Sequence, residues 1–256
     1  MVYIMSQYRS LKYYLDNINI AKRRYIMLGI IGAMDEEVSK LKEVMSDVQI
    51  MTKASMDFYK GTISGKDVVV VRSGIGKVNA GICTQILIDC YGVDVVINTG
   101  IAGSLNAAID IGDVVLATDT LQHDMDATGF GYKPGVIPRM PESTFVADEM
   151  LRKLAKECCE RVNPDIKVFE GRVVSGDQFI SDKAVKERIT SQFAGFCTEM
   201  EGAAIAQAAY LNNIPFLIIR AISDKADDSA TVDYPTFEAK AIDNSVKLMK
   251  EMIANY

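Results

Sequence analysis

Carboxylic acids stand where the chain is otherwise apolar and rich in small residues. In the stretch CTEMEGAAIA, Glu199 and Glu201 flank Met200 just before a run of glycine and alanine. Farther along, the apolar run FLIIRAIS ends in Ser223 and Asp224. A carboxyl group without its hydration is easier to protonate near neutral pH and can then act as a general acid. Asp224 is therefore a candidate proton donor.

These acids also have structural interpretations. Thr198 and Glu201 match the S/T-x-x-E pattern of a capping box, in which Glu201 would only cap a helix. Asp224 could cap the segment after it, although residues 225–228 show no clear helical pattern. In the upstream cluster MDEE, Glu37 would fall in a first helical turn, where the helix dipole alone favours acids.

Glycine-containing stretches follow several of the predicted strands. SGIGKVNAG departs from a dinucleotide fingerprint at Asn79 and from a P-loop at Val78, so it indicates only a tight turn after a strand. NTGIAGSL predicts another turn, in which Gly100 and Gly103 permit close backbone approach. VVSGDQFI places Phe179 beyond a strand, where the ring could stack on a planar base or simply cover the core.

Apolar, β-branched runs alternate with helical patterns along the chain. Strands are predicted at residues 28–31, 68–71, 93–98, 112–117, 168–175 and 215–223. Helices are predicted at residues 36–45, 77–89, 147–161, 182–192, 199–211 and 234–253. This alternation indicates an α/β fold with a largely parallel sheet covered on both faces, in which ligands bind beyond the carboxyl ends of strands.

No linker interrupts the chain after residue 27, so we expect one domain over residues 27–256. Residues 1–26 are basic and rich in tyrosine, and we expect an extension that is not part of the core. The alternative is an amphipathic helix packed on the domain.

The composition of the 256 residues, with 49% hydrophobic and 24% charged side chains, is typical of a folded globular protein. The net charge of −6 argues against nucleic-acid binding and favours a small-molecule ligand. One histidine, His123, and five cysteines without a CxxC pair argue against a metal site and favour reduced thiols in a cytoplasm. No apolar run approaches the roughly 18 residues of a membrane span.

In order, GIIGAMDEE, SGIGKVNA, NTGIAGS, GDVV, VSGDQFI, EMEGAAIA and RAISDKAD resemble the nucleoside phosphorylase/hydrolase family, most closely its 5′-methylthioadenosine/S-adenosylhomocysteine nucleosidases. The ordered set covers residues 27–256. The resemblance implies a three-layer α/β/α sandwich with a central mixed, partly barrel-like sheet, and a homodimer. It also implies hydrolysis of the bond between adenine and the thioribose, without metal or cofactor.

The resemblance also implies roles for individual residues. Glu37 would activate the attacking water, and Asp224 would protonate the imidazole-ring nitrogen of adenine. Glu201 would hold a ribose hydroxyl, with Met200 beneath the sugar. This chemistry needs two carboxyl groups in opposite protonation states, so we expect Asp224 to be neutral by burial and Glu37 to be ionised in contact with water.

Other positions would surround the substrate. Phe179 would stack on the base and the backbone of Ile180 would read its Watson–Crick edge. The remaining substrate-binding residues would be Met34, Ile75 and Tyr234 around the alkylthio group, together with Gly103, Glu199 and Ser223. From the partner subunit, Phe130 and Pro138 would close the same pocket.

Two positions depart from the pattern of the bacterial nucleosidases, because Ile101 replaces the common Ser and Tyr234 the usual Phe. Rival functions stay open at this point. A phosphorolytic purine nucleoside phosphorylase would use arginines such as Arg72 or Arg220 for phosphate, although Asn98 stands where one of them is expected. A nucleosidase for another 5′-substituted adenosine, such as aminofutalosine or 5′-deoxyadenosine, and a non-enzymatic nucleoside binder are further alternatives.

Two reactive side chains receive structural interpretations. His123 could serve as a base, but we expect a structural or interface residue because the carboxyl groups already supply acid–base chemistry. Cys197 has no nearby histidine to activate it, so we expect it to pack rather than to act as a nucleophile.

Overall fold

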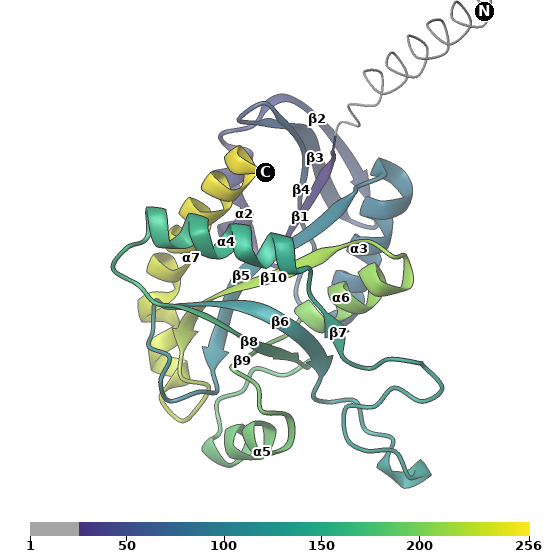
Figure 1. Ribbon diagram of the computed structural model, residues 1–256, viewed down its shortest axis with the longest axis vertical. Coiled ribbons are helices and arrows are strands. Elements are labelled where there is room, and N and C mark those ends of the chain that lie inside the picture. The colour runs from purple at the N-terminus through teal and green to yellow at the C-terminus, as the bar shows by residue number, and fades with distance from the viewer. Residues whose placement is uncertain (1–25) are drawn as a thin grey trace, which may run out of the picture.

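The computed structural model describes residues 26–256, which form a ten-stranded sheet with helices packed around it (Figure 1). The strands are β1 (Leu28–Gly32), β2 (Ser46–Lys53), β3 (Met56–Ile63), β4 (Lys66–Arg72), β5 (Val95–Ser104), β6 (Val114–Gln122), β7 (Phe145–Val146), β8 (Val168–Ser175), β9 (Cys197–Glu199) and β10 (Phe216–Asp224). The α-helices are α2 (Asp35–Lys42), α3 (Lys77–Tyr91), α4 (Glu149–Val162), α5 (Lys183–Phe193), α6 (Gly202–Leu211) and α7 (Ala230–Asn255). A short 3₁₀ helix, η1 (Thr128–Phe130), lies between β6 and β7.

Half of the sheet closes into a barrel. Strand β10 pairs with β5 on one side and with β6 on the other, and β8 and β9 complete the ring. Strands β1, β4, β3 and β2 extend from β5 as an open sheet. Parallel pairs such as β1–β5 alternate with antiparallel pairs such as β10–β6, so the expected mixed, partly barrel-like sheet is confirmed. The apolar runs alone predicted a largely parallel sheet, and that prediction is wrong.

Helices cover the sheet on both sides. Helices α2, α4 and α7 pack together on one side, and α3 packs against α6 on the other (Figure 1). No helix among residues 26–256 is long and apolar enough to cross a membrane.

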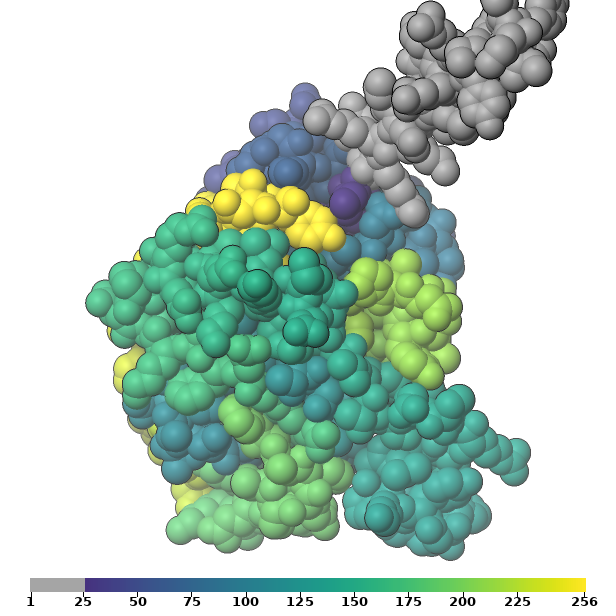
Figure 2. Space-filling model, viewed as in Figure 1, coloured from purple at the N-terminus to yellow at the C-terminus, as the bar shows by residue number. Residues whose placement is uncertain are grey.

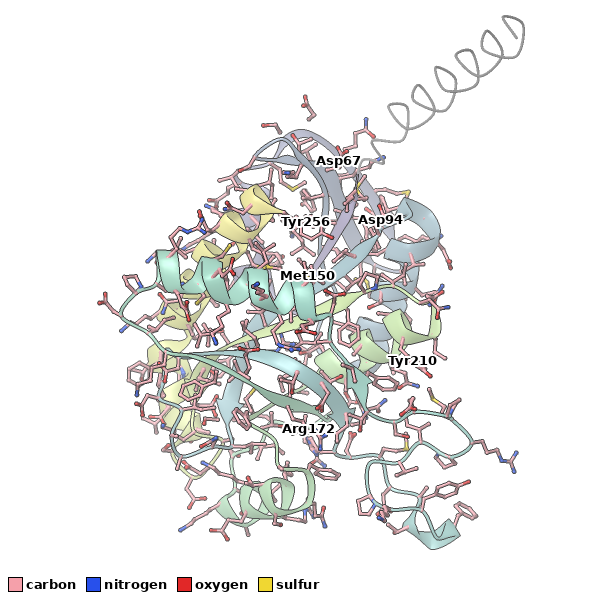
Figure 3. The ribbon with its side chains drawn as sticks, viewed as in Figure 1. Asp67, Asp94, Met150, Arg172, Tyr210 and Tyr256 are labelled. Atoms are coloured by element: carbon pink, nitrogen blue, oxygen red, sulfur yellow. The ribbon has the colours of Figure 1, made fainter. Side chains whose placement is uncertain are left out.

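The central parallel strands β1, β5 and β10 are buried along their whole lengths. Burying each large aliphatic side chain contributes about 1.5–3 kcal/mol, so these strands anchor the fold. All three run in the same direction, and their carboxyl ends at Gly32, Ser104 and Asp224 lie at one edge of the sheet. Around the barrel, Arg172 of β8 pairs with Asp119 of β6 at 2.5 Å, which ties these two strands by their side chains (Figure 3).

The hairpin β2–β3 was not predicted. Every residue of β2 is exposed, so the strand lacks the apolar run by which the buried strands were found. Its turn uses Ala54 and Ser55 at φ angles of 50° and 59°, where Asn-Gly or Asp-Gly is the usual sequence signal.

Two motifs have a different local structure from the one expected. The stretch NTGIAGS continues β5 through to Ser104 and forms no turn. Glu199 ends strand β9, and the helix expected from residue 199 begins only at Gly202.

The segment between β6 and β7, residues 123–144, stands out from the body of the molecule at the lower right of Figure 2. Phe130 lies on this segment and is 87% exposed. The expected extension over residues 1–26 lies outside the described residues, apart from Ile26.

Candidate active site

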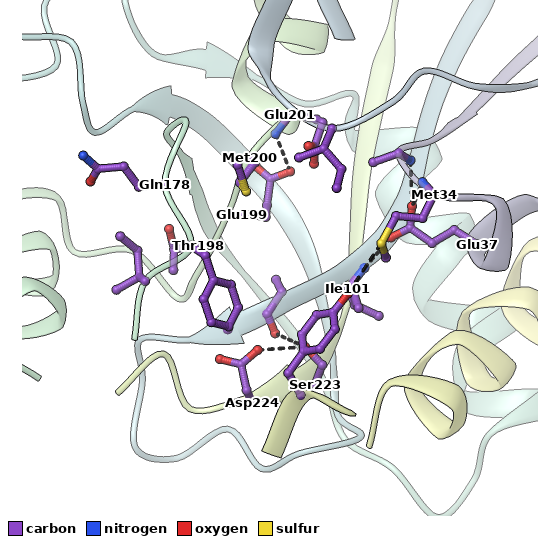
Figure 4. A pocket seen from close by; sticks show the side chains of 17 residues that line it. Met34, Glu37, Ile101, Gln178, Thr198, Glu199, Met200, Glu201, Ser223 and Asp224 are labelled. Atoms are coloured by element: carbon purple, nitrogen blue, oxygen red, sulfur yellow. Dashed lines mark hydrogen bonds between the residues drawn. The ribbon is translucent and has the colours of Figure 1, made fainter. Parts of the chain in front are cut away.

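A cavity of about 470 Å³ opens at the carboxyl ends of the central strands (Figure 4). Every residue expected to bind or transform substrate within one subunit lines it: Met34, Glu37, Ile75, Gly103, Phe179, Ile180, Glu199, Met200, Glu201, Ser223, Asp224 and Tyr234. Residues that are far apart in the chain thus meet at one place. The volume falls within the range of small-molecule sites, roughly 300–1,000 Å³.

Glu37 lies in the first turn of α2 and turns back toward the end of β1. Its Oε2 accepts hydrogen bonds from the backbone N–H groups of Ala33 at 2.6 Å and Met34 at 3.0 Å. Its Oε1 accepts one from the N–H of Ile101 at 3.2 Å. The same carboxylate therefore caps the start of the helix and faces the cavity, so the structural and the catalytic interpretations are compatible.

Glycines in β5 make room for the two candidate catalytic carboxyl groups. A Cβ atom at Gly100 would lie 2.6 Å from Oε1 of Glu37. A Cβ atom at Gly103 would lie 2.7 Å from Oδ1 of Asp224. Any side chain at either position would displace a carboxylate. The expected close approach is present, although it occurs along a strand rather than in a turn.

Asp224 ends β10 at an irregularity in the pairing with β5 between Ile222 and Asp224. Its Oδ2 accepts a hydrogen bond from the Ser223 hydroxyl at 2.9 Å, and its Oδ1 accepts one from the N–H of Ala226 at 2.8 Å. The residue is only 2% exposed. Burial raises the pKa of Asp224 despite these two donors, as expected for a group that holds a proton.

The resemblance predicts an ionised Glu37 in contact with water, and in the structure the residue lines the cavity but is only 6% exposed. Burial raises the pKa of Glu37, while the Arg220 charge and the three backbone donors oppose that rise. A carboxylate with a raised pKa is a stronger proton acceptor than one in water. Glu37 is therefore a buried carboxyl group in the wall of the cavity.

Glu199 forms a buried ion pair with Arg220, whose side chain also donates to Asn98. The Glu199 carboxylate accepts further bonds from the Ser175 hydroxyl and from the N–H of Gly202 at 2.8 Å, at the start of α6. Burial opposes its ionisation, but Arg220 and these donors hold the pKa of Glu199 below its usual range. Glu199 is thus a buried, ionised residue in the wall of the cavity.

Glu201 is held differently from its neighbour Glu199. Burial and the nearby charge of Glu199 raise the pKa of Glu201 to about 8. Its Oε1 accepts a hydrogen bond from the N–H of Gly76 at 2.8 Å. The capping box with Thr198 does not form, because Thr198 Oγ1 has no hydrogen-bond partner within residues 26–256 and Glu199 caps the helix instead.

Apolar side chains form the opposite wall. The rings of Phe179 and Tyr234 meet edge to face with centroids 5.8 Å apart. Phe179 is 50% exposed and Ile75 is 55% exposed, so both offer apolar surface to a ligand. The Tyr234 hydroxyl donates to Glu238 at 2.9 Å and lies 3.5 Å from Sδ of Met34.

Some expectations concern residues away from this cavity. Phe130 and Pro138 do not line it, and both lie on the projecting segment between β6 and β7. His123 also lies outside it, and its Nε2 is buried without a hydrogen-bond partner in the described part of the chain. Cys197 is buried in β9, where burial raises the pKa of its thiol.

Sequence reasoning missed Gln178 and Thr198 as lining residues, and it treated Arg220 only as a possible phosphate ligand. Gln178 had no signal beyond its place between Asp177 and Phe179 in a loop. The pairing of Arg220 with Glu199 had one available signal. Both follow apolar or small residues, and a buried charge requires a partner of opposite sign.

A family model described as the phosphorylase superfamily matches residues 27–254. A 5′-methylthioadenosine/S-adenosylhomocysteine nucleosidase of Staphylococcus carnosus is 43% identical over 228 residues, which cover 89% of this chain and 99% of that protein.

Two solved structures are similar over most of their length. One is the nucleosidase of the same name from Neisseria meningitidis in complex with methylthio-immucillin-A, with a TM-score of 0.85, 38% identity, and coverage of 90% of this chain and 99% of that one. The other is the futalosine hydrolase of Helicobacter pylori, with a TM-score of 0.86, 34% identity, and coverage of 91% and 99%. This chain therefore belongs to the phosphorylase superfamily and, within it, to the family of 5′-methylthioadenosine/S-adenosylhomocysteine nucleosidases.

Proposed function

We propose that the protein hydrolyses the N-glycosidic bond of 5′-methylthioadenosine and S-adenosylhomocysteine, releasing adenine and the thioribose product. Its family membership makes it an N-glycosyl hydrolase. The observation that supports the mechanism is that Glu37 and Asp224 line the same cavity and approach it from different sides (Figure 4).

Asp224 serves as the general acid. Adenine leaves poorly as an anion, so a proton must reach the imidazole ring of the base while the glycosidic bond stretches. The raised pKa of Asp224 favours the protonated form that a general acid needs. The two donors at Ser223 and Ala226 then stabilise the carboxylate that forms after proton transfer.

Glu37 serves as the general base. As the base departs, the sugar gains oxocarbenium character, and water attacks its anomeric carbon. The water proton passes to Glu37, the water oxygen bonds to carbon, and the electrons of the broken bond stay with the protonated adenine. The three backbone donors fix the carboxylate of Glu37, so it needs no reorientation during the reaction.

The remaining lining residues bind the substrate. Glu201 accepts a hydrogen bond from a ribose hydroxyl near Met200. Phe179 stacks on the base, and the backbone of Ile180 binds the Watson–Crick edge of the base. The alkylthio tail lies among the apolar groups Met34, Ile75 and Tyr234, and the set is completed by Gly103, Glu199 and Ser223.

We also propose a homodimer in which the partner subunit's Phe130 and Pro138 close the tail pocket. Both residues lie outside this chain's own cavity. Large apolar side chains are exposed on neighbouring helices, with Val78 on α3 and Leu211 on α6. Together with the exposed Phe130, they provide an apolar surface suited to a partner.

Two observations favour hydrolysis over phosphorolysis. The donors of Arg220 are directed to Glu199, Asn98 and the carbonyl oxygen of Ile219. Arg72 does not line the cavity and lies 3.4 Å from Asp35. Neither arginine is therefore placed to hold a phosphate ion at the site.

A second candidate is hydrolysis of another 5′-substituted adenosine. The similarity to a solved futalosine hydrolase supports it, since the two chains are 34% identical. Ile101 and Tyr234, the two departures from the pattern of the bacterial nucleosidases, both line the cavity.

The decisive experiment measures adenine release from a panel of 5′-substituted adenosines in phosphate-free buffer and again with added phosphate. We expect release from methylthioadenosine and S-adenosylhomocysteine at the same rate in both buffers. Strict dependence on phosphate would identify a phosphorylase. Release only from other members of the panel would favour the second candidate, and adenine binding without any release would indicate a nucleoside binder.

A further inference from the structure

Three loops at the rim of the cavity are joined by a closed ring of hydrogen bonds. Nζ of Lys77, in the first turn of α3, lies 2.5 Å from Oδ1 of Asp124, just after β6. Oδ2 of Asp124 accepts a bond from the N–H of Asp177, after β8, at 3.0 Å. Oδ1 of Asp177 accepts one from the N–H of Lys77 at 2.8 Å, which closes the ring. We call these three residues the rim clasp.

Within the rim clasp, the Lys77–Asp124 pair is shielded from solvent more than an ordinary surface ion pair, whereas Asp177 is exposed. The side chains of Lys77 and Asp124 are 17% and 21% exposed. Nζ of Lys77 also donates to Oε1 of Gln122 at 2.9 Å, and Gln122 is itself bonded to Gln207 of α6 at 2.6 Å. A charge-assisted bond in such surroundings is stronger than an exposed pair, because water competes less for the charges.

The rim clasp lies directly behind two walls of the cavity without lining it. On one side, Ile75 lines the cavity, and the N–H of Gly76 donates to Glu201 at 2.8 Å. On the other side, Phe179 follows Asp177 by two residues, and Gln178 between them is also a lining residue.

The Ile75 side and the Phe179 side of the cavity both depend on hydrogen bonds to hold their positions. Ile75 and Phe179 are about half exposed, so packing alone does little to fix them. Gly76 has a φ angle of 97°, and a Cβ atom there would lie 3.2 Å from Oδ1 of Asp177. A glycine at this position thus lets the two loops come close enough for the bond between Lys77 and Asp177 to form.

We propose that Lys77, Asp124 and Asp177 are positioning residues that fix the distance between Phe179 and the Ile75–Gly76 turn and thereby set the affinity for the purine nucleoside. Glu37 and Asp224 are held by α2 and β10, and the hydrogen bonds of the rim clasp reach neither element. Loosening the rim clasp therefore weakens substrate binding and leaves the proton transfers intact. The inference rests on the proposed function for its substrate but adds residues outside the cavity.

The test uses the full chain with Lys77→Met, Asp124→Ala and Asp177→Ala, each of which removes the side-chain atoms of at least one bond of the ring. The matched control is Arg161→Met, which removes a 2.5 Å ion pair with Glu251 between α4 and α7. For methylthioadenosine, we expect KM to rise about tenfold in each rim-clasp variant, a change equivalent to about 1.4 kcal/mol, with kcat within about threefold of wild type. The control leaves both constants unchanged.

Adenine affinity, measured by calorimetry, tests the rim clasp independently of turnover. A wild-type protein that releases no adenine would contradict the proposed function, whereas a falling adenine affinity in the variants would still support the rim clasp. If the folded variants lost thermal stability but kept wild-type KM and adenine affinity, the ring would be merely structural and the inference wrong. A fall in kcat at constant KM would also overturn it.

Discussion

Glu37 and Asp224 reach the same cavity from parts of the fold that surround them differently. Glu37 lies at the start of α2, where three backbone N–H groups point at its oxygens and the charge of Arg220 is near. Asp224 ends β10, where one backbone N–H and one hydroxyl meet it. Its charged neighbours are the acids Asp233 and Asp227, which oppose its ionisation.

Burial raises the pKa of both carboxyl groups, so burial alone does not separate their roles. The neighbours do. Hydrogen-bond donors favour the carboxylate form at both groups, but the nearby charge is positive at Glu37, where it favours the carboxylate, and negative at Asp224, where it favours the protonated form. The comparison teaches that the proposed acid and the proposed base differ in the charges around them rather than in their depth. Changing either carboxyl group separately tests that assignment.

The largest effect is expected for Asp224→Asn. Without the proton donor, adenine must leave as an anion, so kcat should fall by about 10³-fold or more. The amide keeps the shape of the side chain, so adenine should still bind. The measurement is steady-state adenine release together with calorimetric adenine binding.

Asp228→Asn is the matched control, because Asp228 is an exposed acid on the same loop and its Oδ1 accepts only a 3.3 Å bond from the N–H of Lys183. It should turn over at the wild-type rate. A wild-type rate in Asp224→Asn would reject the acid role and the comparison with it.

A smaller loss is expected for Glu37→Gln. The oxocarbenium-like sugar is already electrophilic, so water can attack with less help, and kcat should fall by about 10²-fold. Substrate affinity should be retained. The neighbouring Glu36→Gln is the control, because Glu36 is exposed on the same helical turn. Equal rates for the two variants would mean that Glu37 is only a helix cap.

The sequence predicted the two carboxyl groups of the site but not the residues that surround them. Asp224 and Glu37 could be found because each follows a buried apolar strand, and ligands bind at such strand ends. The different charges near the two groups could not be predicted from their positions at strand ends. The Arg220 guanidinium comes from the middle of a buried strand, and only the closed barrel shows where it points.

The same limit applies to the fold. The fully buried strands β1, β5 and β10 were predicted, since continuous apolar runs mark them. The exposed β2 and the three-residue β9 carry no such pattern, and pairing with neighbours holds them in place. Glycine positions in β5 were interpreted as turns because sequence alone does not show that Glu37 and Asp224 occupy the space of the missing side chains.

Glu201 extends the comparison to a carboxyl group beside an ionised one, and Glu201→Gln gives the smallest expected effect. The folded pKa of Glu201 is about 8, above its value in an unfolded chain, so the folded state binds more protons between these two values. The stabilisation from that proton is fully present below the unfolded pKa and is lost as pH rises toward the folded one. The free energy of unfolding should therefore fall by up to about 1.4 kcal/mol per pH unit through this residue.

Glutamine does not titrate, so Glu201→Gln should remove this part of the pH dependence while still accepting the bond from Gly76. Urea unfolding at about pH 6 and at about pH 7.5 measures it, and the wild type should lose up to about 2 kcal/mol more than the variant over that interval. The contribution from Asp224 is common to both proteins and cancels in the difference. The exposed Glu187→Gln serves as control and should follow the wild type. If Glu201→Gln lost as much unfolding free energy as the wild type over that interval, Glu201 would be ionised like Glu199. The proximity of Glu199 would then not separate the charge states of the two residues.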